Sequence, residues 1–262
     1  MAFVESGGLK YYRFESFPPD ELIHGIFTRL GGVSPEPWAS LNLGGTVGDL
    51  RDHVIENRRR MFDAIQRPVE SGFDVWQVHG VNVIATDRPR PLDASHEKAD
   101  AILTSSPEIT LYMRFADCVP ILLYDPVKRV VGMVHAGWQG TVEQICRYTV
   151  EKMQSVYGSR PGDLLAGIGP SIGPDHYEVG PDVVARVRSS FNGDANQLLC
   201  SREGRVYFDL WAANRLTLEK AGVKNIETAG LCTACDTTHW FSHRAEKGKT
   251  GRFGAAIALK TK

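Results

Sequence analysis

Three residues that bind metals or attack carbonyl groups follow apolar, strand-like segments. His79 ends one such segment, Cys118 lies between two apolar runs, and His135 ends a third segment. Strand ends hold side chains rigidly while opening onto a cleft, so these positions suit functional groups. Two imidazoles and one thiolate can bind Zn²⁺ or copper, and three protein ligands leave a fourth place for water or substrate.

The spacing of these residues leaves two interpretations open. They are 39 and 17 residues apart, which matches no short zinc-finger pattern. A histidine at a strand end can equally be a hydrogen-bonded core residue, and a cysteine between apolar runs can be a small buried hydrophobe. From spacing alone, a catalytic metal site and ordinary core packing both explain the pattern.

Two glycine-rich turns could contact the charged part of a substrate. Arg29 lies two residues before a Gly-Gly pair, in a loop that could cover a polar substrate or form a simple hairpin turn. The turn after His135 leads into a helix predicted over Thr141–Tyr157, whose free N–H groups could receive phosphate or a carboxylate. Ordinary strand-to-helix turn chemistry explains the second pattern equally well.

A Cys-x-x-Cys motif lies near the end of the chain. It consists of Cys232 and Cys235, and His239 and His243 follow it closely. Taken alone, this group indicates a second zinc site or a redox-active pair of thiols. A structural zinc site needs four ligands in a closed geometry, which weakens the metal interpretation.

Strands and helices mix along the chain without the regular alternation of a doubly wound fold or an eight-fold barrel. Apolar periodicity predicts helices over Asp49–Ile65, Thr141–Tyr157, Pro181–Phe191 and Leu210–Ala221. Asp49 and Asp209 are the expected N-caps, and Arg58 to Arg60 are expected on a solvated helical face. Short apolar segments predict strands over Val75–Val78, Val81–Thr86, Ala101–Thr104, Leu111–Phe115, Ile121–Tyr124, Val130–Val134, Leu164–Ile168 and Phe253–Leu259.

The composition indicates a globular protein of balanced charge. The chain has 262 residues, 42% of them apolar, with 30 Lys and Arg against 31 Asp and Glu. This balance provides no basic field for nucleic acid or anionic lipid, and no apolar segment approaches the ~18 residues of a membrane span. No linker divides the sequence, so we expect one domain over residues 1–262, located in the cytoplasm. Five scattered cysteines do not form a secreted disulfide framework.

Nine short motifs, spread in order over nearly the whole chain, resemble those of the YfiH/YlmD-like family. They are Thr28–Ser34, Ser40–Leu43, Gln77–Gly80, Ala116–Pro120, Val134–Trp138, Gly169–Ile172, Asp209–Asn214, Cys232-Thr233 and Phe241–Arg244. Proteins of this family have been labelled polyphenol oxidases of laccase type, purine nucleoside phosphorylases and peptidoglycan editing factors.

The resemblance implies both a fold and a metal site. The implied fold is α+β, a four-layer α/β/β/α sandwich with mixed sheets, related to cysteine hydrolases of the cytotoxic necrotizing factor type. The resemblance also implies that His79, Cys118 and His135 converge on one metal ion, usually zinc. Cys235 does not always accompany Cys232 in the family, which argues against a second site at this pair.

The resemblance suggests a purine nucleoside enzyme that phosphorolyses adenosine, inosine and 5′-methylthioadenosine and deaminates adenosine. Zinc suits deamination because it lowers the pKa of its bound water to ~7, although the chain lacks the His-x-Glu and Pro-Cys-x-x-Cys signature of nucleobase deaminases. Asp117 is the candidate general acid. Arg29, Asn42 and Gln77 fall on motifs near the cleft and are expected to bind substrate, with Arg29 or the helix at Thr141 holding phosphate.

Other functions would use the same residues. Cys118 could act as a nucleophile with His135 or His79 as its base, giving an amidase that edits a cell-wall precursor. One thiolate cannot serve both purposes, because a zinc-bound sulfur has its nucleophilic lone pair committed. One copper ion at these ligands would give a weak polyphenol oxidase, whereas eight histidines without a His-x-His pair argue against four-copper laccase chemistry. A zinc-storing protein is a further alternative, but three ligands on an open cleft store zinc poorly.

Overall fold

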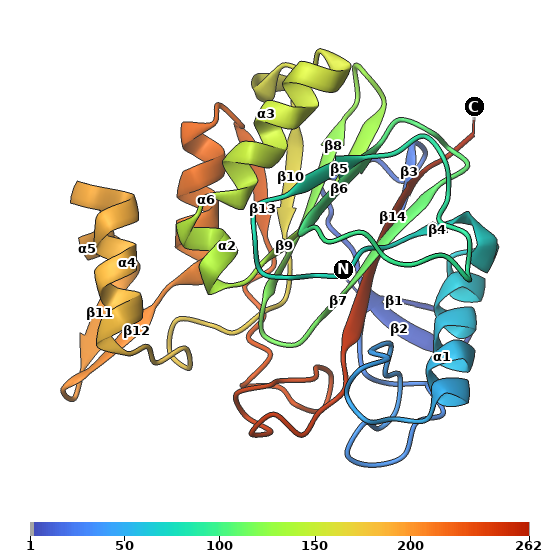
Figure 1. Ribbon diagram of the computed structural model, residues 1–262, viewed down its shortest axis with the longest axis horizontal. Coiled ribbons are helices and arrows are strands. Elements are labelled where there is room, and N and C mark those ends of the chain that lie inside the picture. Colours follow the sequence, from blue (N-terminus) through green and yellow to red (C-terminus); the bar gives the residue numbers. More distant parts are fainter. Residues whose placement is uncertain (1–2, 262) are drawn as a thin grey trace.

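Two six-stranded sheets dominate the computed structural model, which describes residues 3–261 (Figure 1). The first sheet contains, in spatial order, β1 (Phe3–Ser6), β2 (Leu9–Tyr12), β3 (Leu22–Phe27), β14 (Phe253–Leu259), β7 (Thr110–Phe115) and β4 (Gly72–Phe73). The second contains β13 (Asn225–Thr228), β10 (Leu165–Ile168), β8 (Val119–Asp125), β9 (Val130–Ala136), β6 (Ala101–Thr104) and β5 (Val83–Ala85). Both sheets combine parallel and antiparallel pairs, which confirms the mixed α+β class.

Six α-helices, a small hairpin and three single-turn 3₁₀-helices (Val69–Ser71, Pro161–Asp163 and Asn192–Asp194) complete the described part of the chain. The helices are α1 (Arg51–Ala64), α2 (Trp138–Val142), α3 (Ile145–Tyr157), α4 (Pro181–Phe191), α5 (Ala195–Leu198) and α6 (Leu210–Lys220). The hairpin consists of β11 (Leu199–Arg202) and β12 (Arg205–Phe208), and it projects with α4 and α5 at the left of Figure 1. Every helix in residues 3–261 falls short of the length and apolarity needed to cross a bilayer.

Three apolar clusters hold these elements together. The central cluster joins the facing sides of the two sheets and includes Met113 of β7, Leu122 of β8 and Met133 of β9. A second cluster lies between the second sheet and helices α3, α4 and α6, and a third lies between the first sheet and α1. Side chains alternate between the two faces of a strand, so one strand supplies two clusters. Burial on both faces explains the continuously apolar strands.

Most predicted elements are confirmed, with small shifts at their ends. The strands Ala101–Thr104 and Phe253–Leu259 and the helix Pro181–Phe191 have the predicted bounds. Asp209 caps α6 as expected, because its side chain accepts the N–H of Ala212. The strand predicted over Val75–Val78 was wrong: its backbone makes only an isolated bridge at Trp76, because backbone groups of Val75 and Val78 bond to side chains instead of to a neighbouring strand.

The predicted helix Thr141–Tyr157 was also wrong at its start. It is two helices, α2 and α3, separated at Gln144, which has a left-handed φ of 64°. Thr141 therefore lies near the end of α2, is buried, and accepts a hydrogen bond from Asn214. The helix that follows the glycine-rich turn starts at Trp138 instead, so Thr141 offers no free helix N-terminus to an anion.

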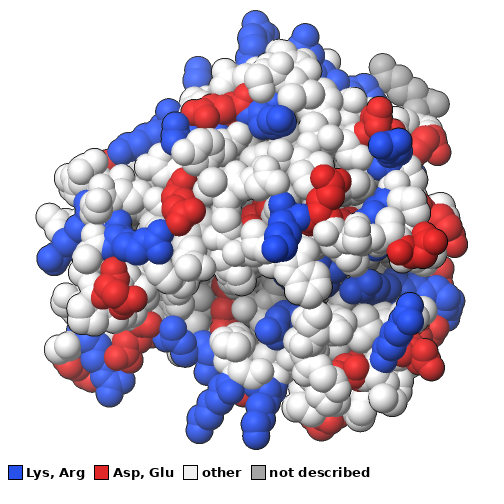
Figure 2. All heavy atoms as spheres, viewed as in Figure 1, with Lys and Arg blue, Asp and Glu red and all other residues white. Residues whose placement is uncertain are grey.

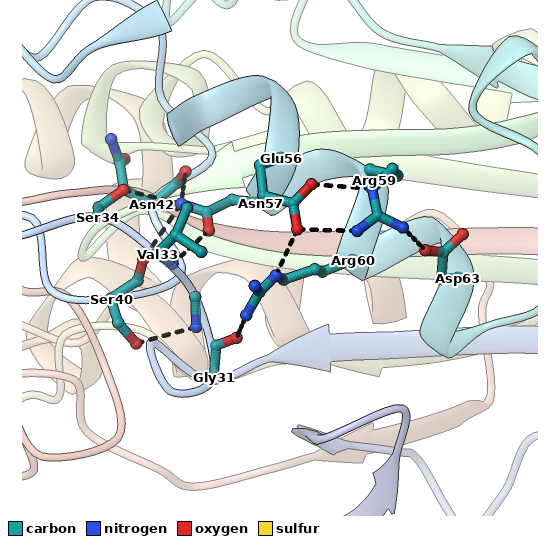
Figure 3. Close-up of polar contacts among 11 residues, drawn as sticks. Gly31, Val33, Ser34, Ser40, Asn42, Glu56, Asn57, Arg59, Arg60 and Asp63 are labelled. Atoms are coloured by element: carbon teal, nitrogen blue, oxygen red, sulfur yellow. Dashed lines mark hydrogen bonds and ion pairs between the residues drawn. The ribbon is translucent and has the colours of Figure 1, made fainter. Parts of the chain in front are cut away.

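Helix α1 fixes a long loop through one buried amide (Figure 3). Asn57 is fully buried, and its Nδ2 donates to Ser34 Oγ and to the carbonyls of Ser40 and Asn42. Its Oδ1 accepts the N–H of Val33. Together these contacts hold residues 33–42 against the helix. A single side chain thus positions the loop that follows Arg29.

The arginines of α1 divide between solvent and the protein interior. Arg59 is exposed and pairs with Glu56 and Asp63, as expected for a solvated face. Arg58 instead donates to the carbonyl of Leu43, so the expectation of one solvated triplet was wrong for this residue. Charges of both signs are interspersed over the visible face in Figure 2, which agrees with the net charge of −1.

Candidate metal centre

His79, Cys118 and His135 lie together in the structure, although they are far apart in sequence. Their ligand atoms all lie within 4.8 Å of one another, and Cys118 Sγ is 3.8 Å from His79 Nε2. Sulfur and nitrogen ligands of one tetrahedral zinc ion are about 3.6 Å apart, given its usual bond lengths. The cluster therefore has the dimensions of a zinc site, and His79 is its solvent-exposed member.

Three segments place these ligands at one end of the sheets, and the first is the loop before β5, which carries His79. His135 is the last residue but one of β9, whereas Cys118 lies in the turn that carries the chain from β7 to β8. His79 and Asp117 have positive φ angles, of 62° and 79°. Such backbone is costly for residues other than glycine and is concentrated at functional sites.

Asp100 orients two of the three ligands, although no role was predicted for it. Its Oδ1 accepts from His135 Nδ1 at 2.8 Å and from the backbone N–H of His79 at 2.9 Å. Its Oδ2 accepts the N–H groups of Val78 and Gly80. A carboxylate that binds the far nitrogen of a histidine fixes the tautomer that presents the other nitrogen to a metal. An acidic residue directly before the buried strand β6 was the signal in the sequence.

Gly137 leaves room for the cluster. A Cβ atom at this position would lie 2.8 Å from His79 Cδ2 and 3.1 Å from Cys118 Sγ. Its φ of −70° is accessible to any residue, so close approach rather than backbone conformation requires glycine here. The Gly in the Val134–Trp138 motif therefore has a specific steric function.

Cys118 and His135 stabilise each other's charged forms. Burial disfavours the thiolate, but the imidazoles of His135 and His79 outweigh it and lower the pKa of Cys118 to about 6. Burial likewise disfavours protonated His135, but Cys118 and Asp100 outweigh it and raise the pKa of His135 to about 9. The thiolate is the form that binds a metal, so Cys118 is prepared to act as a ligand.

Asp117 connects the cluster to two other loops. Its Oδ1 accepts from Thr233 Oγ1 at 2.7 Å, and its Oδ2 accepts the N–H of Arg244 at 2.6 Å. The observed role of this carboxylate is therefore that of a hydrogen-bond acceptor. Its role as a general acid stays a prediction.

Two arginines lie near this end of the site, and neither had a role predicted from the sequence. Arg244 lies over the ring of Tyr177, with its guanidinium carbon 5.1 Å from the ring centroid. Burial lowers the pKa of Arg252, while the negative charges of Cys118 and Asp117 act on it in the opposite direction. Arg252 thus places positive charge near the cluster, whereas the guanidinium of Arg244 donates to the carbonyl of Glu178. The Phe241–Arg244 motif contained part of this signal.

The three predicted substrate-binding residues make structural hydrogen bonds. Arg29 is buried and donates to Ala39, Thr237 and Glu246, and Asn42 is fully buried with bonds that include the N–H of Arg252. Gln77 exchanges two hydrogen bonds with the backbone of Arg114 in β7. All three stabilise loops around the site, and direct contact with a substrate stays a prediction.

The fold and this cluster agree with a family assignment. The chain belongs to the family described as multi-copper polyphenol oxidoreductase laccase, whose model matches residues 23–260. Among its relatives is a purine nucleoside phosphorylase of Deinococcus radiodurans, which is 40% identical over 236 residues, covering 90% of this chain and 88% of the relative. The purine nucleoside phosphorylase YlmD of Bacillus subtilis is 38% identical over 251 residues, covering 92% and 89%.

Solved structures confirm the YfiH/YlmD resemblance. YlmD from Geobacillus stearothermophilus has a TM-score of 0.92 at 34% identity, covering 99% of each chain. A hypothetical protein YfiH from Bacillus licheniformis has a TM-score of 0.91 at 34% identity, covering 98% of this chain and 99% of the other.

Proposed function

We propose that this protein is a metal-dependent purine nucleoside phosphorylase. The observation that carries the proposal is the convergence of His79, Cys118 and His135 within 4.8 Å in a chain whose relatives bear that name. Adenosine, inosine and 5′-methylthioadenosine are the proposed substrates, with phosphate as the second substrate. Deamination of adenosine is a proposed secondary activity at the same site.

Zinc is the proposed ion, because the donor set is two imidazoles and one thiolate with a carboxylate behind one imidazole. Copper is compatible with the same donors and would account for the oxidase label of the family. When bound, the metal would supply Lewis-acid chemistry to a substrate at its open position.

Side chains around the cluster would carry out the rest of the phosphorolysis reaction. Phosphorolysis transfers the ribosyl C1′ from the purine nitrogen to a phosphate oxygen, so the enzyme must hold a phosphate dianion and assist the leaving purine. Arg252 places positive charge near Cys118 and Asp117, which favours phosphate binding there. Asp117 is the proposed proton donor to the purine. The bonds from Thr233 and Arg244 would hold its carboxyl group in place.

The test is turnover by protein of known metal content. Native protein incubated with adenosine and phosphate should release adenine and ribose 1-phosphate in equal amounts, and inosine formed without phosphate would report deamination. Cys118→Ala should lose turnover together with the ion bound at this cluster, whereas Cys200→Ala, at an exposed cysteine of β11, should lose neither. Metal-loaded native protein without turnover, or full turnover by Cys118→Ala, would contradict the proposal.

One observation favours an amidase as the second candidate. Cys118 Sγ lies 3.8 Å from His79 Nε2, an arrangement that also suits a nucleophile and its base. Metal separates the two candidates, because an amidase of this kind would work without metal and a phosphorylase would not. Cleavage of an amide by chelator-treated protein, abolished by alkylation of Cys118, would support the amidase.

A further inference from the structure

A second cluster of metal-binding side chains lies outside the centre described above. The ligand atoms of His176, Cys232 and Cys235 all lie within 4.8 Å of one another. His176 Nδ1 is 3.5 Å from Cys235 Sγ and 3.9 Å from Cys232 Sγ. These separations bracket the value of about 3.6 Å for sulfur and nitrogen ligands of one tetrahedral zinc ion.

Backbone hydrogen bonds hold the two segments that carry this cluster side by side. The segment before His176 pairs with the segment at Cys232, since Ser171 donates to Leu231 and accepts the N–H of Thr233. Gly173 donates its N–H to Cys232 Sγ at 3.2 Å. The ligands therefore come from two segments that the fold already joins, so little ordering is needed to bind an ion.

The cluster borders an open hollow of about 320 Å³. Cys232, Cys235 and Asp175 all line this hollow, so an ion could enter and a fourth ligand could come from Asp175 or water. His239, which the sequence placed beside the motif, pairs instead with Asp236. The histidine that joins the two thiols thus comes from a turn 56 residues before Cys232.

We propose that His176, Cys232 and Cys235 form a second metal site, selective for a thiophilic ion such as zinc. Two thiolates and one neutral imidazole neutralise a divalent ion, and sulfur ligands select zinc over magnesium or calcium. This site reverses the expectation, based on the family resemblance, that the Cys-x-x-Cys motif has no metal function. It is independent of the proposed catalytic activity, because it shares no residue with the first cluster.

Occupancy of this site would stabilise the surroundings of the first cluster. Thr233, between the two thiols, donates to Asp117, and the carbonyl of Asp117 accepts the N–H of Ile172. Both segments of the second site therefore contact the residue that precedes Cys118. The expected role is structural, with the ion joining two turns that together hold Asp117.

Metal stoichiometry tests the site directly. Native protein equilibrated with zinc and then desalted should hold two ions per chain by elemental analysis. The double variant His79→Ala, Cys118→Ala should hold one, and adding Cys235→Ser should leave none. Cys235 is exposed, so its replacement by serine should leave the fold intact, and Cys200→Ser is the matched control with no expected loss. Zinc content that is unaffected by Cys235→Ser in either background would overturn the proposal.

Thiol alkylation tests the site in unmodified protein. Zinc should slow the reaction of Cys232 and Cys235 with N-ethylmaleimide, read by peptide mass spectrometry, and a chelator should restore it. Exposed Cys200 should react equally in both conditions and serves as the internal reference. Equal rates at Cys235 with and without zinc, or a disulfide between Cys232 and Cys235 in protein kept under reducing conditions, would refute the metal site.

Discussion

Replacing Asp100 by asparagine would test whether a buried carboxylate prepares the metal centre. Asparagine has nearly the same shape but keeps only one acceptor oxygen, and its NH₂ group must face two donors. With Asp100, each oxygen accepts two N–H groups, those of His135 and His79 at Oδ1 and those of Val78 and Gly80 at Oδ2. Two of the four hydrogen bonds are therefore lost in either orientation of the amide.

The expected magnitude follows from this count. Hydrogen bonds to a charged group contribute about 1.5–3 kcal/mol each, so the metal-free variant should lose about 3 kcal/mol or more of its free energy of unfolding. Removal of a carboxylate behind a ligating histidine typically weakens metal binding about 10- to 100-fold, which corresponds to about 1.4–2.7 kcal/mol. The variant should thus fold but bind zinc weakly at the first cluster.

Two assays separate these effects. Urea unfolding in the presence of a chelator gives the stability of the metal-free protein, and competition with a chromogenic chelator gives the zinc Kd, measured in a Cys235→Ser background. The matched control is Asp125→Asn: this aspartate is also buried, and within residues 3–261 its Oδ2 has no hydrogen-bond partner. The control should leave the zinc Kd unchanged. An unchanged Kd in Asp100→Asn would refute the role assigned to the carboxylate.

Two further substitutions test other features. Gly137→Ala would place a Cβ 2.8 Å from the ring of His79, so the zinc Kd should rise about tenfold or more with little change in unfolding free energy. Gly193→Ala, whose Cβ would meet nothing within 4 Å, is its control; equal Kd values would discount the steric argument. Burial lowers the pKa of His24 to about 3 from its ordinary 6.5, so the unfolded chain binds the extra proton and stability falls as the pH drops below 6.5. At pH 5 the loss should be about 2 kcal/mol relative to pH 7, and His24→Gln should remove it; the same pH dependence in both proteins would show that another group is responsible.

The fold was largely predictable because burial leaves a clear pattern in the sequence. Strands such as Val130–Ala136 are covered on both faces, so their apolar runs were unambiguous. The break between α2 and α3 was not predictable, because Gln144 adopts a left-handed conformation that its residue type does not indicate. Val75–Val78 has a strand-like composition, but its backbone forms only an isolated bridge, so the segment is a loop.

The site was predictable only in part, because spacing along the chain carries no information on proximity across two sheets. The types of His79, Cys118 and His135 suggested ligands, and the family resemblance supplied their convergence. Asp100 and His176 were missed for the same reason, since each acts on partners that are far away in sequence. Arg29 suggested a substrate contact because of its charge, whereas its observed bonds are to neighbouring loops.

The crossing from β7 to β8 gives the first cluster a mechanical property. Cys118 lies where the chain leaves one sheet for the other, and His135 belongs to the second sheet alone. An ion bound there would link the two sheets. At a free ion concentration of 100 Kd it would add about 2.7 kcal/mol to the free energy of unfolding. Scarcity of the ion would then lower the free energy of unfolding as well as the activity.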